Sequence, residues 1–135
     1  MFQHEIQVRV RYAETDQMGY VYYGNYATYF EVARVEAMRA VGFSYKKMEE
    51  EGVMMPVLEL KNQFKSPGRY DELLTIRISI PKMPTLKILF QYEVIGEDGR
   101  EIGLGETTLV FVNKKISKPV RMPKELVELL EPYFR

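Results

Sequence analysis

The chain has no cysteine, and His4 is its only histidine among 135 residues. Without cysteine there are no disulfides, no thiolate metal sites and no cysteine nucleophile. The only histidine lies close to the N-terminus, so we expect neither a Ser–His–Asp triad nor a histidine-rich metal site. We accordingly expect no bound metal.

An excess of charge and long apolar runs are also missing. Nineteen basic residues balance nineteen acidic ones, so no strong field favours nucleic acid or membrane surfaces. The first ten residues lack the basic start and apolar core of a signal peptide, and no stretch has the length of a transmembrane helix. We therefore expect a cytoplasmic protein that binds neither nucleic acid nor membranes.

The pattern of apolar residues predicts one α+β domain over residues 1–135, with a core large enough to need no metal or disulfide. Alternation indicates a first strand from Ile6 to Tyr12. A long helix follows, and then a short one that Ser44 caps. Four more strands come next, and Pro123 opens a terminal helix. Consecutive strands of this kind favour an antiparallel sheet, whose open edges invite pairing with a second copy of the chain.

The predicted strands are bounded by turn residues. They are expected at 57–65, 74–80, 86–94 and 100–113, with a hairpin turn at 96–99. Apolar side chains alternate along each of them, as Leu58, Leu60 and Phe64 do in the first. Gly103 and Gly105 lie inside the last strand, where they indicate a bulge or a close approach of the backbone.

The rest of the chain is organised around the segment from Arg11 to Arg39. Its second half predicts a helix from Tyr26 to Val41, with Asn25 as N-cap and Gly42 as the left-handed residue that ends it. Apolar residues also occur among the charged ones on its second arc, so we expect burial around most of the circumference. Those residues are Ala27, Val32, Val35 and Met38.

A polar loop with one central acid, Asp16, leads directly into this helix. A helix N-terminus carries unpaired N–H groups and a partial positive charge, so it can polarise a carbonyl oxygen. A carboxylate beside such a carbonyl can act as a nucleophile or as a general base on water. The spacing alone also allows the simpler interpretation that Asp16 only caps a turn.

Two stretches carry a resemblance to a known family. The first is RYAETDQMGYVYYGNY, residues 11–26, followed by Phe30-Glu31 and Arg34, and the second is YDELLTI, residues 70–76. With these motifs the chain resembles, over nearly its whole length, the hotdog-fold acyl-CoA thioesterases of the 4-hydroxybenzoyl-CoA type. The resemblance implies a curved, five-stranded antiparallel sheet wrapped round one long central helix. It also implies homodimers or homotetramers with sites at the subunit interface.

The resemblance also implies roles for individual residues. Asp16 would attack the thioester carbonyl or activate water, and the backbone N–H of Tyr23 would polarise that carbonyl. Many similar thioesterases have histidine where this chain has Tyr23, but the backbone N–H is common to both. Gly24, Asn25 and Tyr26 would line the substrate site at the helix entrance. Coenzyme A is part of the substrate, so no cofactor is expected.

Coenzyme A carries phosphates, so its binding groove needs cations. The candidates are Lys61, Lys65, Arg69, Lys82 and Lys87, of which we predict Lys61, Lys65 and Lys87 as contacts. Met48, Met54 and Met55 are candidates for the acyl pocket or for plain core. Glu14 is expected to be a solvated loop acid, and Glu31 to pair with Arg34 three residues further along the helix.

Three alternatives to acyl-CoA hydrolysis are considered. Hydration of an enoyl thioester uses an Asp–His pair in enzymes of this fold, and His4 is the only histidine. A non-catalytic protein would keep the groove and bind acyl thioesters without turnover. The acyl group could also be carried by an acyl carrier protein, because the pantetheine arm is common to both carriers.

Overall fold

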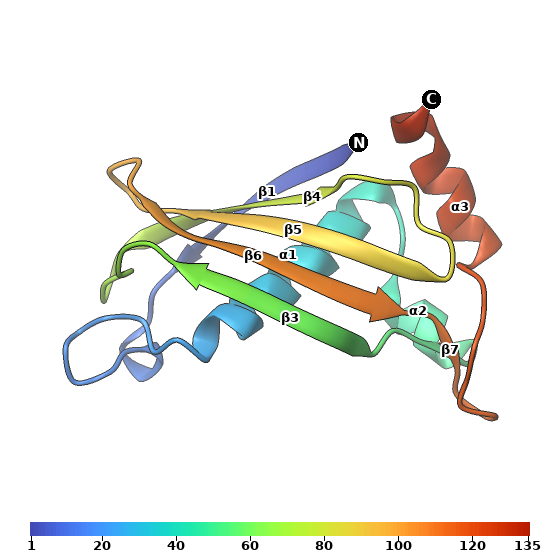
Figure 1. Ribbon diagram of the computed structural model, residues 1–135, viewed down its shortest axis with the longest axis horizontal. Coiled ribbons are helices and arrows are strands. Elements are labelled where there is room, and N and C mark those ends of the chain that lie inside the picture. Colours follow the sequence, from blue (N-terminus) through green and yellow to red (C-terminus); the bar gives the residue numbers. More distant parts are fainter.

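The computed structural model describes residues 1–135, and its centre is a single long helix inside a curved sheet (Figure 1). The elements are β1 (Phe2–Arg9), η1 (Tyr12–Glu14), α1 (Asn25–Val41), α2 (Tyr45–Glu50), β2 (Val53–Met54), β3 (Val57–Phe64), β4 (Leu73–Ile80), β5 (Lys87–Ile95), β6 (Glu101–Val110), β7 (Val112–Asn113), β8 (Lys118–Pro119), α3 (Lys124–Leu130) and η2 (Glu131–Phe134). The first strand lies further toward the N-terminus than predicted: it already begins at Phe2, and it ends at Arg9 because the chain then leaves the sheet and Tyr12 begins a 3-10 turn.

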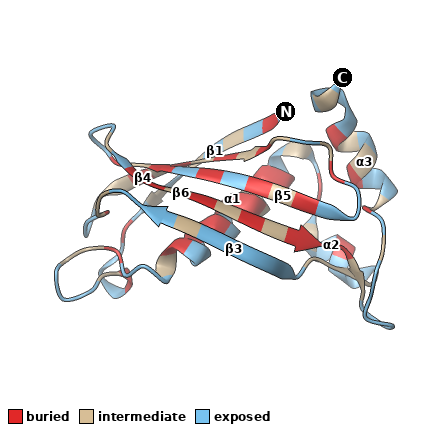
Figure 2. Cartoon of the chain, viewed as in Figure 1, coloured by how far each residue is buried: buried red, intermediate tan, exposed pale blue.

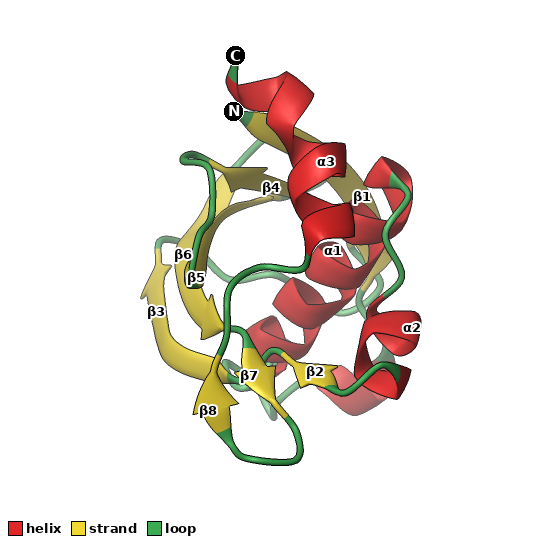
Figure 3. Ribbon diagram, turned by 90° about the vertical axis from the view of Figure 1, so that its right-hand side faces the viewer, coloured by secondary structure: helices red, strands yellow, loops and turns green.

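The main sheet has five strands in the order β1-β4-β5-β6-β3, and every neighbouring pair is antiparallel. Figure 3 shows this sheet curving round α1, which lies against one face. The predicted hotdog architecture is therefore confirmed. A second, three-stranded sheet of β2, β7 and β8 was not predicted, because its strands are only two residues long.

The core lies between α1 and the inner face of the sheet. The side chains of β4 alternate between half-buried and buried, so Leu74, Ile76, Ile78 and Ile80 all face α1. On the helix, the buried apolar positions are Tyr26, Tyr29, Phe30, Ala33, Ala37 and Met38. The prediction of burial around most of the helix is wrong for the single chain, since Ala27, Val32 and Ala40 are exposed.

Two glycine predictions are confirmed by geometry. Gly42 ends α1 with φ of 97°, a backbone conformation that costs glycine little. A Cβ atom on Gly105 would lie 2.6 Å from the ring of Phe30, and one on Gly103 would lie 2.7 Å from the Gln63 carbonyl oxygen. These glycines let α1 and β3 approach β6 closely.

The two edges of the sheet differ. At the β1 edge, the N-terminal amine donates a 2.6 Å hydrogen bond to the Tyr133 carbonyl, and the ring of Phe2 meets the ring of Tyr133. The C-terminal segment therefore covers the start of β1. At the other edge β3 has no neighbour beyond it, and Figure 2 shows it largely exposed. Leu58, Leu60 and Phe64, predicted to share one apolar face of this strand, are about half exposed, at 55%, 47% and 56%.

Candidate active site

The acid predicted to carry the chemistry lies on a tight loop before α1. The Asp16 N–H donates a 2.8 Å hydrogen bond to the Tyr20 carbonyl, and Thr15 and Val21 form an antiparallel bridge. Gly19 makes the turn between them with φ of 76°. The loop is thus a small closed hairpin, with Asp16 at the start of its turn.

The two oxygens of the Asp16 carboxylate have different surroundings. Its Oδ1 atom accepts hydrogen bonds from the Met18 and Tyr20 N–H groups at 2.9 and 3.2 Å, which caps the turn. Its Oδ2 atom has no hydrogen-bond partner, and the residue is exposed. One oxygen therefore orients the carboxylate while the other is free to meet a substrate or water.

The entrance of α1 offers unpaired backbone donors. Gly24 is the N-cap and gives the helix no side-chain cap, and the N–H groups of Tyr23 and Gly24 make no hydrogen bond. Together with the helix dipole, these groups favour an electronegative oxygen at this end. The prediction that Asn25 is the N-cap is wrong: Asn25 is the first helical residue, and its side-chain amide donates to the Glu14 carbonyl at 2.8 Å.

Glu14 anchors the loop to the helix, and the prediction that it is a solvated loop acid is wrong. Only 8% of the residue is exposed. Its carboxylate accepts hydrogen bonds from the Arg11 N–H at 2.9 Å, from the Arg11 guanidinium at 2.6 Å and from the Tyr29 hydroxyl at 2.9 Å. Burial opposes ionisation, but these hydrogen bonds outweigh it and lower the pKa of Glu14.

We therefore expect the stability conferred by Glu14 to depend on pH. A carboxyl whose pKa is lower in the folded state stabilises the fold above its unfolded pKa of about 4.3, and that contribution disappears as pH falls through the folded value. Glu14→Gln should lower the free energy of unfolding by about 1–3 kcal/mol at pH 7. The free energy of unfolding, measured with urea, should differ less between the native protein and the variant at pH 3.5 than at pH 7. A difference of the same size at both pH values would contradict this role.

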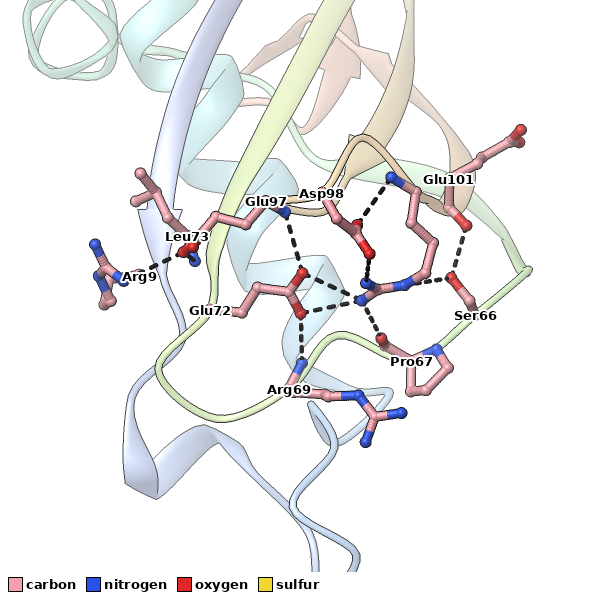
Figure 4. Close-up of polar contacts among 10 residues, drawn as sticks. Arg9, Ser66, Pro67, Arg69, Glu72, Leu73, Glu97, Asp98 and Glu101 are labelled. Carbon is pink, nitrogen blue, oxygen red and sulfur yellow. Dashed lines mark hydrogen bonds and ion pairs between the residues drawn. The ribbon is translucent and has the colours of Figure 1, made fainter.

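The segment from Ser66 to Glu72 supports the loop from the other side. The Gly68 carbonyl accepts from the Val21 N–H at 2.8 Å, and the Tyr70 N–H donates to the Gly19 carbonyl at 2.9 Å. The segment is itself held by a polar network around Glu72 (Figure 4). In that network Arg100 donates to both Glu72 oxygens at 3.1 Å and to the Pro67 carbonyl at 2.8 Å. The β5–β6 turn is therefore connected to the Asp16 loop.

The site extends to the end of β3. The ring centroid of Phe64 lies 6.3 Å from that of Tyr23 and 5.8 Å from that of Tyr26. Tyr26 is buried, whereas Tyr23 and Phe64 are 65% and 56% exposed. In the single chain the helix entrance and the β3 edge thus form one open, aromatic surface beside Asp16.

The predicted cations do not converge on this surface. Lys65 follows the end of β3 near the site, whereas Lys87 begins β5 at the opposite end of the sheet, paired with Val110. Lys61 lies on the outer face and forms a 3.0 Å ion pair with Glu59. Arg69, which was considered as well, is close to the site, with its guanidinium 5.1 Å from the ring centre of Tyr20.

Other predicted residues lie elsewhere. Arg34 does not pair with Glu31, because its guanidinium turns inward and donates to the Tyr92 hydroxyl at 3.1 Å. Met48 is buried in the core, and Met54 and Met55 are half-buried. A cavity of about 490 Å³ lies on the outer face of the sheet, away from Asp16. It is lined by residues such as Lys61, Arg77, Gln91 and Glu106.

Neither a cluster of metal-binding side chains nor a membrane-spanning helix is found in the fold. No group of three or more His, Cys, Asp or Glu residues is placed to hold a metal ion. None of the helices combines the length and the apolar character needed to cross a membrane.

Sequence reasoning did not identify Glu72 or Arg100 as residues that support the site. Their separation of 28 positions gives no local signal, and only the fold brings their side chains together. Phe64 was predicted as a strand residue but not as part of the site. Its place at the helix entrance follows from the β3–β6 pairing, which sequence alone does not give.

Comparison with known proteins supports the same fold and family. Residues 10–130 match the thioesterase-like superfamily. The chain is 30% identical over 120 residues to the acyl-CoA thioester hydrolase YbgC of Escherichia coli O6:H1, covering 89% of this chain and 90% of that protein.

Two solved structures extend the comparison. The DHNA-CoA thioesterase from Staphylococcus aureus superposes with a TM-score of 0.91 at 35% identity, over 98% of this chain and 89% of that one. A 4-hydroxybenzoyl CoA thioesterase shares the fold, with a TM-score of 0.85 at 19% identity over 96% of this chain and 99% of that one. By the matched length and by the fold, the chain belongs to the thioesterase-like superfamily.

Proposed function

We propose that this protein hydrolyses an acyl-CoA thioester to a free acid and coenzyme A. The observation that carries the proposal is the free Asp16 Oδ2 atom on the loop leading into the unpaired N–H groups of Tyr23 and Gly24. A thioester carbonyl bound to those donors is polarised, and the carboxylate is oriented by its other oxygen. Membership of the thioesterase-like superfamily supports the same reaction.

Two routes lead to the same products. As a general base, Asp16 takes a proton from water while the water oxygen attacks the carbonyl carbon. The tetrahedral oxyanion is held by the Tyr23 and Gly24 N–H groups. It collapses with cleavage of the carbon–sulfur bond, and the thiolate leaves and takes up a proton. As a nucleophile, Asp16 attacks the carbonyl itself, and the carbon–sulfur bond breaks to release the thiolate, which takes up a proton. Water then hydrolyses the mixed anhydride, which frees the acid and restores Asp16.

We further propose that the working unit is a homodimer joined along the β3 edge. That edge is unpaired, and its inward apolar side chains are exposed beside the site. An open apolar edge of this kind pairs readily with a second copy. A second copy placed there would cover Phe64 and the helix entrance, and so would enclose the acyl group.

The test is release of free thiol from a panel of short, long and aromatic acyl-CoAs by the native protein. We expect turnover with at least one member, and the preferred chain gives the substrate class. Acylated carrier protein assayed beside the matching acyl-CoA distinguishes the two carriers. If acyl-CoAs bind but release no thiol, hydrolysis is wrong, and a non-catalytic binding protein becomes the better interpretation.

A further inference from the structure

A buried arginine in the middle of α1 has no acidic partner. Arg34 is 9% exposed, and no carboxylate lies within ion-pair distance of its guanidinium. Its one hydrogen bond goes from Nη1 to the Tyr92 hydroxyl at 3.1 Å. A guanidinium carries five N–H donors, and burying its charge without a counter-charge is costly. The fold therefore keeps a cation whose bonding capacity is mostly unused.

The groups around Arg34 are neutral hydroxyls. The Tyr92 hydroxyl lies 2.6 Å from the Thr107 hydroxyl. The Tyr45 hydroxyl is the only buried side-chain polar atom without a partner. Burial raises the pKa of Tyr45 to about 12, an effect that nearby Arg34 opposes, so this hydroxyl stays protonated and can donate. The Arg34 cluster, made of Arg34, Tyr45, Tyr92 and Thr107, thus holds a positive charge with no ion-pair partner and a hydroxyl with no hydrogen bond.

The cluster is not sealed off. Nε and Nη2 of Arg34 make no hydrogen bond, yet neither is among the buried unpartnered atoms, so both keep access to solvent. Ala27, Glu31 and Arg34 follow one another at helical spacing along one flank of α1. The first two are exposed. Arg34 donates to Tyr92 on β5, and Phe30, four residues earlier on the helix, packs against Gly105 on β6. This flank therefore faces the β6–β3 side of the sheet, where the exposed apolar side chains of β3 lie.

The distance from the proposed reaction centre suits an acyl group. Arg34 follows Tyr23 by eleven positions, which corresponds to about 16.5 Å along a helix axis. Helical side chains lean toward the N-terminus, which shortens the gap that a ligand must span. An acyl group whose carbonyl sits at the helix entrance therefore reaches the Arg34 cluster with the far end of a chain of medium length.

We propose that Arg34 binds the far end of the acyl group, and that the preferred substrates are acyl-CoAs whose acyl chain ends in a carboxylate. This inference rests on the proposed hydrolysis at Asp16. A carboxylate supplies the negative charge that the cluster lacks, and its two oxygens match the planar fork of a guanidinium. The Tyr45 hydroxyl would donate a further hydrogen bond to it.

The experiment compares acyl-CoAs in pairs of equal length, with and without a terminal carboxylate: adipoyl with hexanoyl, suberoyl with octanoyl, and sebacoyl with decanoyl. We expect the native protein to prefer the carboxylate at one length by about 10- to 100-fold in kcat/KM. In Arg34→Met that ratio should fall to one or below. In Arg39→Met, on the exposed side of the same helix, it should be unchanged.

Two further measurements keep the outcome decisive. Tyr45→Phe removes only the unpaired hydroxyl and should lower the ratio several-fold, which covers the case in which Arg34→Met does not fold. CoA thioethers that carry the same chains cannot be hydrolysed. Their dissociation constants therefore measure binding at the Arg34 cluster without turnover. A protein that binds the carboxylated thioether more tightly but hydrolyses nothing would contradict the proposed function and leave this inference standing.

The inference is overturned if the native protein prefers the plain chain at every length, or if Arg34→Met keeps the preference for the carboxylate. A third result would also overturn it. If Glu31→Gln and Arg34→Met weaken the dimer equally while the plain chain is preferred, then Glu31 of a second copy is the acceptor that Arg34 lacks.

Discussion

Replacing Asp16 by Asn is expected to lower kcat for acyl-CoA hydrolysis by at least about 10²- to 10⁴-fold. The substitution removes the negative charge that either activates water or attacks the carbonyl. It keeps an oxygen where Oδ1 accepts from the Met18 and Tyr20 N–H groups, so the loop should retain its shape. Thiol release measured beside a thermal melt separates lost chemistry from lost folding.

Asp71→Asn provides the matched control for this variant. Asp71 is an exposed acid in the neighbouring 66–72 segment, and its φ of 66° suits asparagine as well as aspartate. The same change of charge at this position should leave turnover within about twofold. Equal activity of native protein and Asp16→Asn would refute the catalytic role of Asp16. Glu14 could not simply replace it, since its carboxylate is already bound by Arg11 and Tyr29.

The second large effect is expected at the open edge of the sheet. Leu60→Asp should convert a dimer into single chains, because it places a charge in the middle of the apolar face of β3. Losing a buried leucine costs about 1.5–3 kcal/mol, and a twofold interface contains the residue twice. The dissociation constant should therefore rise by about 10²- to 10⁴-fold. Turnover should fall with it if the acyl site is completed by the second copy.

Sedimentation at several protein concentrations, run in parallel with the thiol assay, measures both effects. Gln63→Asp adds the same charge to the same strand on its outer face. It should change neither the sedimenting mass nor the rate of thiol release. A native protein that sediments as a single chain at assay concentration, yet turns over acyl-CoA, would exclude the β3 dimer as the working unit.

Much of the fold was predictable because each element carries its own local pattern. The alternation of apolar side chains located β4 and β5, and the turn from Gly96 to Gly99 joined β5 to β6. The helix from residue 26 to 41 was predicted to within one residue, since Gly42 is the left-handed residue that ends it. Asp16 was found from its place just before that helix, together with the motif that resembles the thioesterases.

Tertiary structure decided what depends on contacts between distant segments. By its sequence context Glu14 is an ordinary loop acid, and only the approach of Tyr29 and the fold of η1 bury it. Glu31 and Arg34 have the spacing of a helical ion pair, but the hydroxyl of Tyr92 on β5 draws the guanidinium into the core.

The same limit applies to the edges of the sheet and to the lysines. Alternation shows that β3 has an apolar face, but not that the strand lies at an edge with that face uncovered. Lys65 and Lys87 were grouped by position in the chain, whereas strand pairing places them at opposite ends of the sheet. Sequence by itself determined the elements and the position of the candidate acid, because those follow from local periodicity and motif. Only the fold decided which charges are buried and which faces stay open, because these depend on neighbours that are remote in the chain.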